Sequence, residues 1–126
     1  ADIDIEKLVA FHKAHGKIAT LTAVRPSARF GSILMEEDGH ILEFKEKPQT
    51  GEGWINGGYF VFDYKIFDYL ENESTILERE PLENLAKDNQ LVAYKHDGFW
   101  HCMDTIRDRD NLNEIWACGN APWKKW

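Results

Sequence analysis

The chain has 126 residues, of which 43% are apolar, 13% aromatic and 29% charged, as in a globular protein rather than a disordered one. This length fits a single domain, and the net charge of −7 disfavours binding to nucleic acid or to anionic membranes, which need clustered Lys and Arg. Cys102 and Cys118 show no disulfide framework, and we find no signal peptide or long apolar run. These features predict a reduced, cytoplasmic protein without membrane contact.

The first half of the chain predicts one helix followed by four strands. Apolar residues at helical spacing indicate a helix over 4–15, capped by Asp4 or Asp2 and ended by Gly16. Short apolar or β-branched runs predict strands at 18–24, 32–36, 40–46 and 55–62. The first and last of these are apolar on both faces, which is typical of buried strands. Asp38-Gly39 predicts a hairpin turn between the middle two.

The second half predicts three helices and two more strands. A short helix is expected near 66–70, and a second begins with Pro81 at its first position. Strands are expected at 91–94 and 99–100, joined at Asp97-Gly98. Thr105-x-x-Asp108 resembles a capping box and predicts a helix that ends near Gly119. The whole pattern predicts an α/β fold with a mixed β-sheet and flanking helices in one domain, residues 1–126.

The pair Glu46-Lys47 is the first candidate site. A carboxylate accepts hydrogen bonds from vicinal hydroxyls and an ammonium pairs with a phosphate, so the pair suits a sugar phosphate. Gly57 and Gly58, at the start of the next predicted strand, would let the backbone approach a ligand closely. The alternative is a solvated charge pair before the Pro48 turn.

Six segments together resemble the glucose-1-phosphate cytidylyltransferases, a branch of the sugar-1-phosphate nucleotidyltransferase family. They span nearly the whole chain: His12 to Ala23, Arg29-Phe30-Gly31, Glu46-Lys47-Pro48, Ile55-Asn56-Gly57-Gly58, Phe99 to Thr105, and Ala121-Pro122-Trp123-Lys124. The resemblance implies the C-terminal part of a Rossmann-like nucleotidyltransferase fold. It also implies a bacterial enzyme that makes CDP-glucose and pyrophosphate from CTP and glucose 1-phosphate, for polysaccharide biosynthesis.

The resemblance assigns roles to individual residues. Asp104 matches a magnesium-binding aspartate, Lys47 the lysine that binds the sugar phosphate, and Glu46 the carboxylate that contacts sugar hydroxyls. Gly31 and Asn56-Gly57-Gly58 would complete the sugar pocket, and Arg29 would assist phosphate binding. A structural alternative for Asp104 is a helix N-cap or a strand end that hydrogen-bonds to backbone amides.

Two elements of the family are missing from the sequence, namely a glycine-rich triphosphate loop and a Gly-Asp-Gly element with a second metal aspartate. The chain therefore resembles the C-terminal, sugar-phosphate-binding half, and we expect it to be inactive without the N-terminal half. Trp123 and Trp126 suggest subunit contacts and hence a homo-oligomer. Alternatives are a non-catalytic sugar-phosphate-binding or assembly module, or half of a thymidylyl- or uridylyltransferase.

Three other chemistries are disfavoured. His96, His101 and Cys102 lack the spacing of a structural zinc site. A Cys102 thiol nucleophile with His101 as its base fails if the two are adjacent in a strand, because their side chains then point to opposite faces. A Glu46 and Asp104 glycosidase pair leaves Lys47 unexplained.

Overall fold

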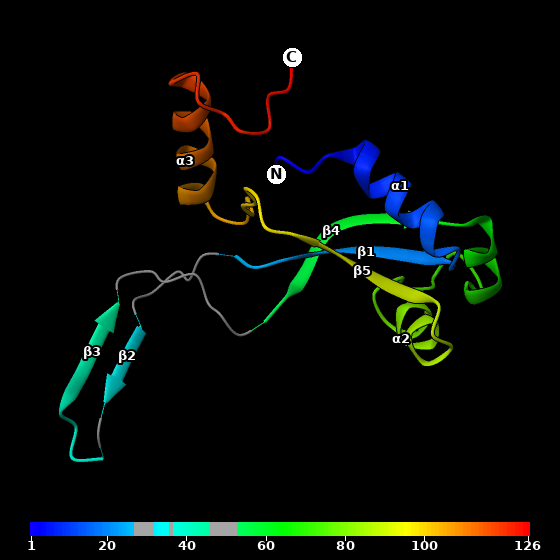
Figure 1. Cartoon of the computed structure of the whole chain (residues 1–126), viewed down its shortest axis with the longest axis horizontal. Coiled ribbons are helices and arrows are strands. Elements are labelled where there is room, and N and C mark those ends of the chain that lie inside the picture. Colours follow the sequence, from blue (N-terminus) through cyan, green and yellow to red (C-terminus); the bar gives the residue numbers. More distant parts are fainter. Residues whose placement is uncertain (27–31, 36, 46–52) are drawn as a thin grey trace.

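The computed structural model describes residues 1–26, 32–35, 37–45 and 53–126, which form an α/β arrangement (Figure 1). Along the chain the elements are α1 (Ile5–His15), β1 (Ala19–Val24), β2 (Ser32–Met35), β3 (Ile41–Lys45), β4 (Ile55–Phe62), the 3-10 helix η1 (Tyr64–Tyr69), α2 (Glu80–Lys87), β5 (Leu91–His96) and α3 (Ile106–Ala117). None of the helices in this described part is long and apolar enough to cross a membrane.

Within the described ranges, the main sheet has three strands in the order β4-β1-β5, with β1 in the centre. β1 runs antiparallel to β4, with Val24 opposite Ile55, and parallel to β5, with Val24 opposite His96. The predicted mixed sheet is therefore confirmed. The predicted hairpin is also confirmed, because β2 and β3 pair antiparallel around Asp38-Gly39.

Local signals in the sequence set the ends of the helices as predicted. The Asp4 side chain accepts a hydrogen bond from the Lys7 amide at 3.0 Å, and Gly16 ends α1 in the left-handed conformation, with φ of 65°. At α3, Thr105 and Asp108 form a complete capping box. α2 begins at Glu80, one residue before the predicted start, and Pro81 lies in its first turn, where its missing N–H costs nothing.

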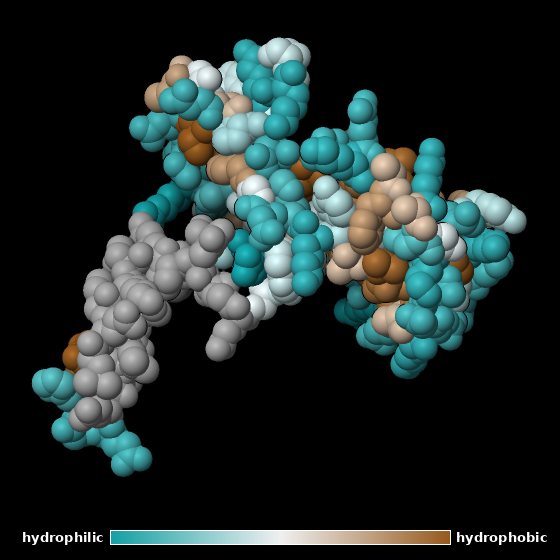
Figure 2. All heavy atoms as spheres, viewed as in Figure 1, coloured by the Kyte–Doolittle hydropathy of each residue, from teal (hydrophilic) through white to brown (hydrophobic). Residues whose placement is uncertain are grey.

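The core lies around β1, where Ala19 packs with Ile66 of η1 and Leu85 of α2. In Figure 1, α1 lies above the strands and α2 below them. α3 has no buried residue, and Trp116 on it is 47% exposed. Figure 2 shows apolar surface among hydrophilic side chains at the position of α3.

A hydrogen-bond chain attaches α1 to β1. The Lys17 amide donates to His15 Nδ1 at 2.9 Å, so that nitrogen carries no proton, and His15 Nε2–H donates to Thr20 Oγ1 at 2.6 Å. The Thr20 hydroxyl in turn donates to Nδ1 of the buried His12 at 2.8 Å. Neutral His15 is therefore built into the fold, since a proton on Nδ1 would face the Lys17 N–H.

Two expectations about the strands are wrong. β4 is expected to be buried, but Ile55 is 44% and Tyr59 37% exposed, so the described residues do not cover both of its faces. It is also an edge strand, which pairs only with β1 within the described residues. The second strand predicted at 99–100 does not form, and 97–104 has no strand structure. β5 instead finds its partner in β1, a contact between distant parts of the chain that local pattern does not reveal.

The stability of the chain should fall as the pH drops below about 6.5. Burial, followed by the nearby charges of His12 and Lys17, lowers the pKa of His15 from its ordinary value of 6.5. The unfolded chain then binds the proton more readily, so the contribution of neutral His15 is complete above that value and is lost as pH falls through the folded pKa. Urea unfolding at about pH 7.5 and about pH 5.5 measures the loss.

His15→Gln provides the comparison, because glutamine keeps one acceptor and one donor but does not titrate. We expect the free energy of unfolding of the variant to depend less on pH than that of the parent. The difference between the two slopes against pH should not exceed the slope that binding of one proton produces. Equal slopes for the two proteins would contradict the assignment.

The isolated chain should self-associate through the open edge of β4. Exposed apolar strand edges are templates for pairing with another chain. Light scattering over a range of concentrations should show an increase in mean mass, and Ile55→Lys should suppress it. Ile76→Lys is the matched control, because Ile76 is similarly exposed, at 51%, but lies outside the strands. A monomer at every concentration would show that the chain closes its own core.

Candidate functional site

The candidate site lies at the edge of the sheet where β1 and β5 end and β4 begins. Val24, His96 and Ile55 are neighbours in the strand register at this edge. In open α/β sheets, ligands bind outside the carboxyl ends of the parallel strands. The sequence between Asp97 and Asp104 follows β5 directly, so this edge also receives the segment that leads to α3.

Asn56-Gly57-Gly58 forms an irregularity in β4 at this edge. Leu21 pairs with Phe60 and Ala23 with Asn56, so β4 has extra residues here, as in a β-bulge. Gly58 adopts a φ of 83°, and its amide donates to Asn56 Oδ1 at 2.8 Å. This bond uses the Asn56 side-chain oxygen and not its NH₂ group.

Gly57 is buried for a reason that the sequence does not reveal. A Cβ atom there would lie 2.8 Å from Val24 Cγ1 and 3.0 Å from the Thr22 carbonyl oxygen. The absence of a side chain thus serves packing of β4 against β1, while close approach of the Gly57 backbone to a ligand stays a prediction. The Gly57 carbonyl accepts a hydrogen bond from Trp100 Nε1 at 3.0 Å, which attaches the segment 97–104 to β4.

A second attachment holds the segment 97–104 to the start of the chain. Asp2 Oδ1 lies 2.9 Å from His96 Nε2, and the Asp2 amide donates to the Phe99 carbonyl at 3.0 Å. A Cβ atom on Gly98 would lie 2.5 Å from Asp2 Oδ1, so only glycine fits there without a shift. Sequence analysis missed this pair, because the two side chains are far apart in the chain.

Asp104 is exposed and lies just before α3. The N-cap alternative for Asp104 is wrong, because Thr105 Oγ1 caps the helix by accepting from the Asp108 amide at 3.1 Å. Within the part of the chain that the structure describes, the Asp104 carboxylate has no hydrogen-bond or ion-pair partner. Its backbone amide donates to Asp108 Oδ2 at 3.3 Å. An exposed carboxylate of this kind fits a magnesium ion, which takes one or two carboxylates and keeps its waters.

The remaining predicted site residues lie outside the described residues. These are Gly31, Glu46 and Lys47, together with Arg29. Of the predicted site residues that the structure describes, Gly57 is joined to Trp100, which lies four residues before Asp104 in the sequence.

A cationic cluster that sequence analysis did not single out also lies at this edge. Arg25, directly after β1, pairs with Asp97 at 2.9 Å, and its guanidinium lies 4.6 Å from the ring centre of Trp54. Lys95 Nζ lies 5.5 Å from the same ring. Together with Asp97, these two cations leave a net charge of +1 next to the ends of β1 and β5, although the chain as a whole is acidic.

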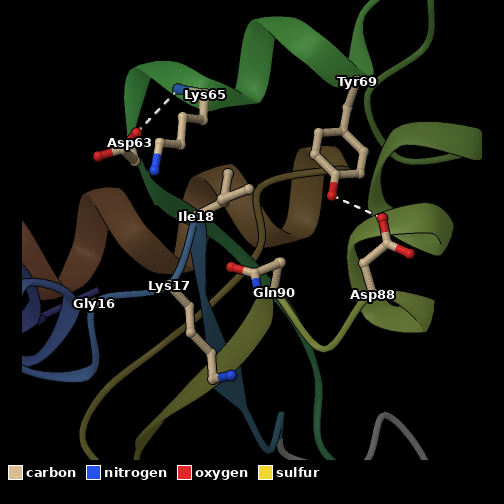
Figure 3. Close-up of a pocket in the computed structure, with 8 residues that line it drawn as sticks. All are labelled: Gly16, Lys17, Ile18, Asp63, Lys65, Tyr69, Asp88 and Gln90. Carbon is tan, nitrogen blue, oxygen red and sulfur yellow. Dashed lines mark hydrogen bonds between the residues drawn. The ribbon is translucent and has the colours of Figure 1, made fainter.

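The pocket in Figure 3 lies at the other edge of the sheet, where β1 and β5 begin. It has a volume of about 360 Å³ and is lined by Gly16, Lys17, Ile18, Asp63, Lys65, Tyr69, Asp88 and Gln90. Tyr69 donates to Asp88 Oδ2 at 2.8 Å, a bond that raises the pKa of Tyr69. The pocket lies at the amino ends of the parallel strands, so it is separate from the candidate site at their carboxyl ends.

The sequence of the chain matches a known protein family. Residues 1–108 match the nucleotidyl transferase family model, which is most of the chain, and the protein therefore belongs to that family.

Among individual relatives, the chain is 47% identical over 126 residues to the glucose-1-phosphate cytidylyltransferase of Salmonella typhi. It is 37% identical over 116 residues, 89% of the chain, to the mannose-1-phosphate guanylyltransferase catalytic subunit beta of Dictyostelium discoideum. The first match covers 100% of this chain but 49% of the Salmonella protein, and the second covers 32% of the Dictyostelium protein. The chain thus spans half or less of the length of these curated relatives.

Solved structures support the same fold. The chain superposes with a TM-score of 0.59 and 20% identity on a candidate glucose-1-phosphate thymidylyltransferase from Bacillus anthracis that was solved with sucrose. The match covers 98% of this chain and 51% of the other. HddC from Yersinia pseudotuberculosis gives a TM-score of 0.57, with 90% and 50% covered. The predicted nucleotidyltransferase fold is confirmed.

Replacement of Asp104 should leave stability unchanged, whereas replacement of its neighbour should not. Thr105→Ala removes the cap of α3 and should lower the free energy of unfolding by about 1 kcal/mol. Asp104→Ala removes a carboxylate that supports no contact among the described residues, so its effect should be within about 0.5 kcal/mol. Urea unfolding of the two variants beside the parent tests this. A larger loss for Asp104→Ala would assign that residue to the fold.

Proposed function

We propose that the chain supplies the sugar-phosphate-binding half of a glucose-1-phosphate cytidylyltransferase, which makes CDP-glucose and pyrophosphate from CTP and glucose 1-phosphate. The observation that carries the proposal is the 47% identity to the Salmonella typhi protein of that name along the whole chain. The exposed Asp104 carboxylate, on the segment that Trp100 attaches to Gly57, agrees with it. The choice of cytosine and glucose rests on the relatives, and thymidylyl or uridylyl transfer are the alternatives within the class.

The reaction needs positioning and neutralisation of charge more than covalent help from the protein. An oxygen of glucose 1-phosphate attacks the α-phosphorus of CTP in line, the new P–O bond forms, and pyrophosphate leaves. Lys47 is assigned to the sugar phosphate, where its ammonium reduces the repulsion between two anionic substrates. Glu46 is assigned to the sugar hydroxyls as a hydrogen-bond acceptor.

Asp104 is the residue that would hold magnesium in this half. When bound, Mg²⁺ offsets negative charge on the phosphates of both substrates. Asp104 suits this role because its carboxylate is exposed while its backbone is fixed: the Asp104 amide donates to Asp108, and Trp100, four residues earlier, is attached to Gly57. A second metal aspartate and a triphosphate loop would come from an N-terminal half.

Some polar groups of the segment around Gly57 form hydrogen bonds within the protein, and we assign the others to the ligand. The Gly57 carbonyl and Asn56 Oδ1 are used within the protein, by Trp100 and by the Gly58 amide. We assign the Asn56 NH₂ group to a hydroxyl of the sugar. The space beside Gly58, where a Cβ atom would meet no described atom within 4 Å, is assigned to the close approach of the sugar ring. Gly31 is assigned to the same pocket.

The isolated chain should show no measurable transferase activity, because it lacks a triphosphate loop. The test is incubation with CTP, glucose 1-phosphate and Mg²⁺ and an assay for pyrophosphate. The same assay on a protein that joins this chain to a matching N-terminal half is the positive control. Turnover by the isolated chain at ordinary enzyme rates, about 1 s⁻¹ or more, would contradict the half-enzyme proposal.

In such a joined protein, Asp104→Asn should lower kcat by on the order of 10²–10³-fold, because the charge that it helps to hold acts most strongly in the transition state. Lys47→Ala should mainly raise the KM for glucose 1-phosphate, by on the order of tenfold or more, because Lys47 already contacts the phosphate in the ground state. Steady-state kinetics at varied sugar phosphate and Mg²⁺ separate the two effects. An Asp104→Asn protein with unchanged kcat and unchanged Mg²⁺ dependence would remove Asp104 from the metal site.

A further inference from the structure

Three side chains with metal-binding atoms meet just before α3. His101, Cys102 and Asp108 are each half-buried, and their ligand atoms all lie within 4.8 Å of one another. The set differs from His96, His101 and Cys102, which the sequence spacing disfavoured as a zinc site, since His96 pairs with Asp2 and Asp108 takes its place. The expectation that the neighbouring side chains 101 and 102 point apart is wrong here, because the segment is not a strand.

The tautomer of His101 suits metal binding. Its Nδ1 lies 2.6 Å from the Cys102 carbonyl oxygen, which can only accept, so Nδ1 carries the proton. The lone pair of the neutral ring is then on Nε2. A hydrogen bond from Nδ1–H to a backbone carbonyl is the usual way in which a metal-binding histidine is oriented.

Asp108 is fixed in place by the capping box. Its Oδ2 accepts from the Thr105 amide at 3.0 Å and from the Asp104 amide at 3.3 Å. These bonds orient the carboxylate next to His101 and Cys102, and a carboxylate oxygen is a ligand that a divalent cation accepts. The carboxylate therefore comes to the cluster already ordered by helix formation.

We propose that His101, Cys102 and Asp108 form a binding site for a borderline-soft divalent cation, with Zn²⁺ as the best fit. One nitrogen, one thiolate and one carboxylate oxygen match the ligands of Zn²⁺, whereas Mg²⁺ takes oxygen alone. Three protein ligands leave a fourth tetrahedral position for water. Zn–ligand bonds of about 2.0–2.3 Å set neighbouring ligand atoms roughly 3.5 Å apart. Side-chain rotations that bring the ligand atoms closer by about 1 Å would therefore allow all three to bind one ion. The proposal stands independently of the transferase assignment.

Cobalt titration of the purified 126-residue chain tests the site. Co²⁺ replaces Zn²⁺ in such sites and, with a thiolate ligand, gives a ligand-to-metal charge-transfer band in the near ultraviolet. We expect one Co²⁺ per chain with this band and with the visible absorption of a tetrahedral complex. Zn²⁺ should displace Co²⁺ stoichiometrically, and Zn²⁺ should raise the unfolding temperature.

Variants assign the ligands. Cys102→Ser should abolish the charge-transfer band, and Cys118→Ser is the matched control that should keep it, because Cys118 is exposed and outside the cluster. His101→Gln and Asp108→Asn should each weaken Co²⁺ binding at least about tenfold, and the amide introduced by Asp108→Asn retains an oxygen that can accept from the Thr105 amide. Circular dichroism confirms folding of each variant.

Absence of a charge-transfer band in the parent chain, or a band that survives Cys102→Ser, would overturn the proposal. A band that appears only together with a rise in mean mass caused by Co²⁺, measured by light scattering against the metal-free chain at the same concentration, would overturn it too, since the metal would then bridge two chains.

Discussion

The position of β1 in the centre of the main sheet is the constraint on which the rest of the molecule depends. β1 pairs on both sides, antiparallel with β4 and parallel with β5, so its backbone groups are satisfied by two different partners. Five of its six residues are buried. The two pairings together bring the beginning of β4 and the end of β5 to one edge, where Gly57 accepts a hydrogen bond from Trp100 of the segment 97–104.

Polar side chains inside this strand fix its register. Thr20 and Thr22 are both completely buried, and Thr20 is held by His12 and His15 from α1. A shift of one residue would turn every side chain of the strand to the opposite face and would separate Thr20 from both histidines. The Thr22 hydroxyl has no hydrogen-bond partner among the residues described, so the polar groups here contribute specificity at some cost in stability.

Features that depend on neighbouring residues could be predicted from the sequence, whereas features that depend on contacts between distant residues could not. The Gly16 stop, the Asp38-Gly39 turn and the capping box of α3 each depend on a few neighbouring residues, and each was predicted. The exposure of β4 and the pairing of β5 with β1 depend on contacts far along the chain, which no local pattern encodes. The candidate site follows the same distinction. Residue types and family resemblance pointed to Asp104 and to Gly57, but the physical reason for Gly57 is its packing against β1. The bond from Trp100 to Gly57 joins residues 43 positions apart, beyond the reach of any local signal.

The parallel pairing of β1 with β5 also sets an order of events during synthesis. β4 is synthesised before β5, so β1 can pair first with β4. Its other side stays unpaired until residues 91–96 have been synthesised. At about 5–20 residues per second, the interval between the end of β1 and the start of β5 lasts roughly 3–13 s, far longer than the microseconds in which α1 forms. During that interval one edge of the central strand is open on the nascent chain, which makes it a natural point of contact for a chaperone.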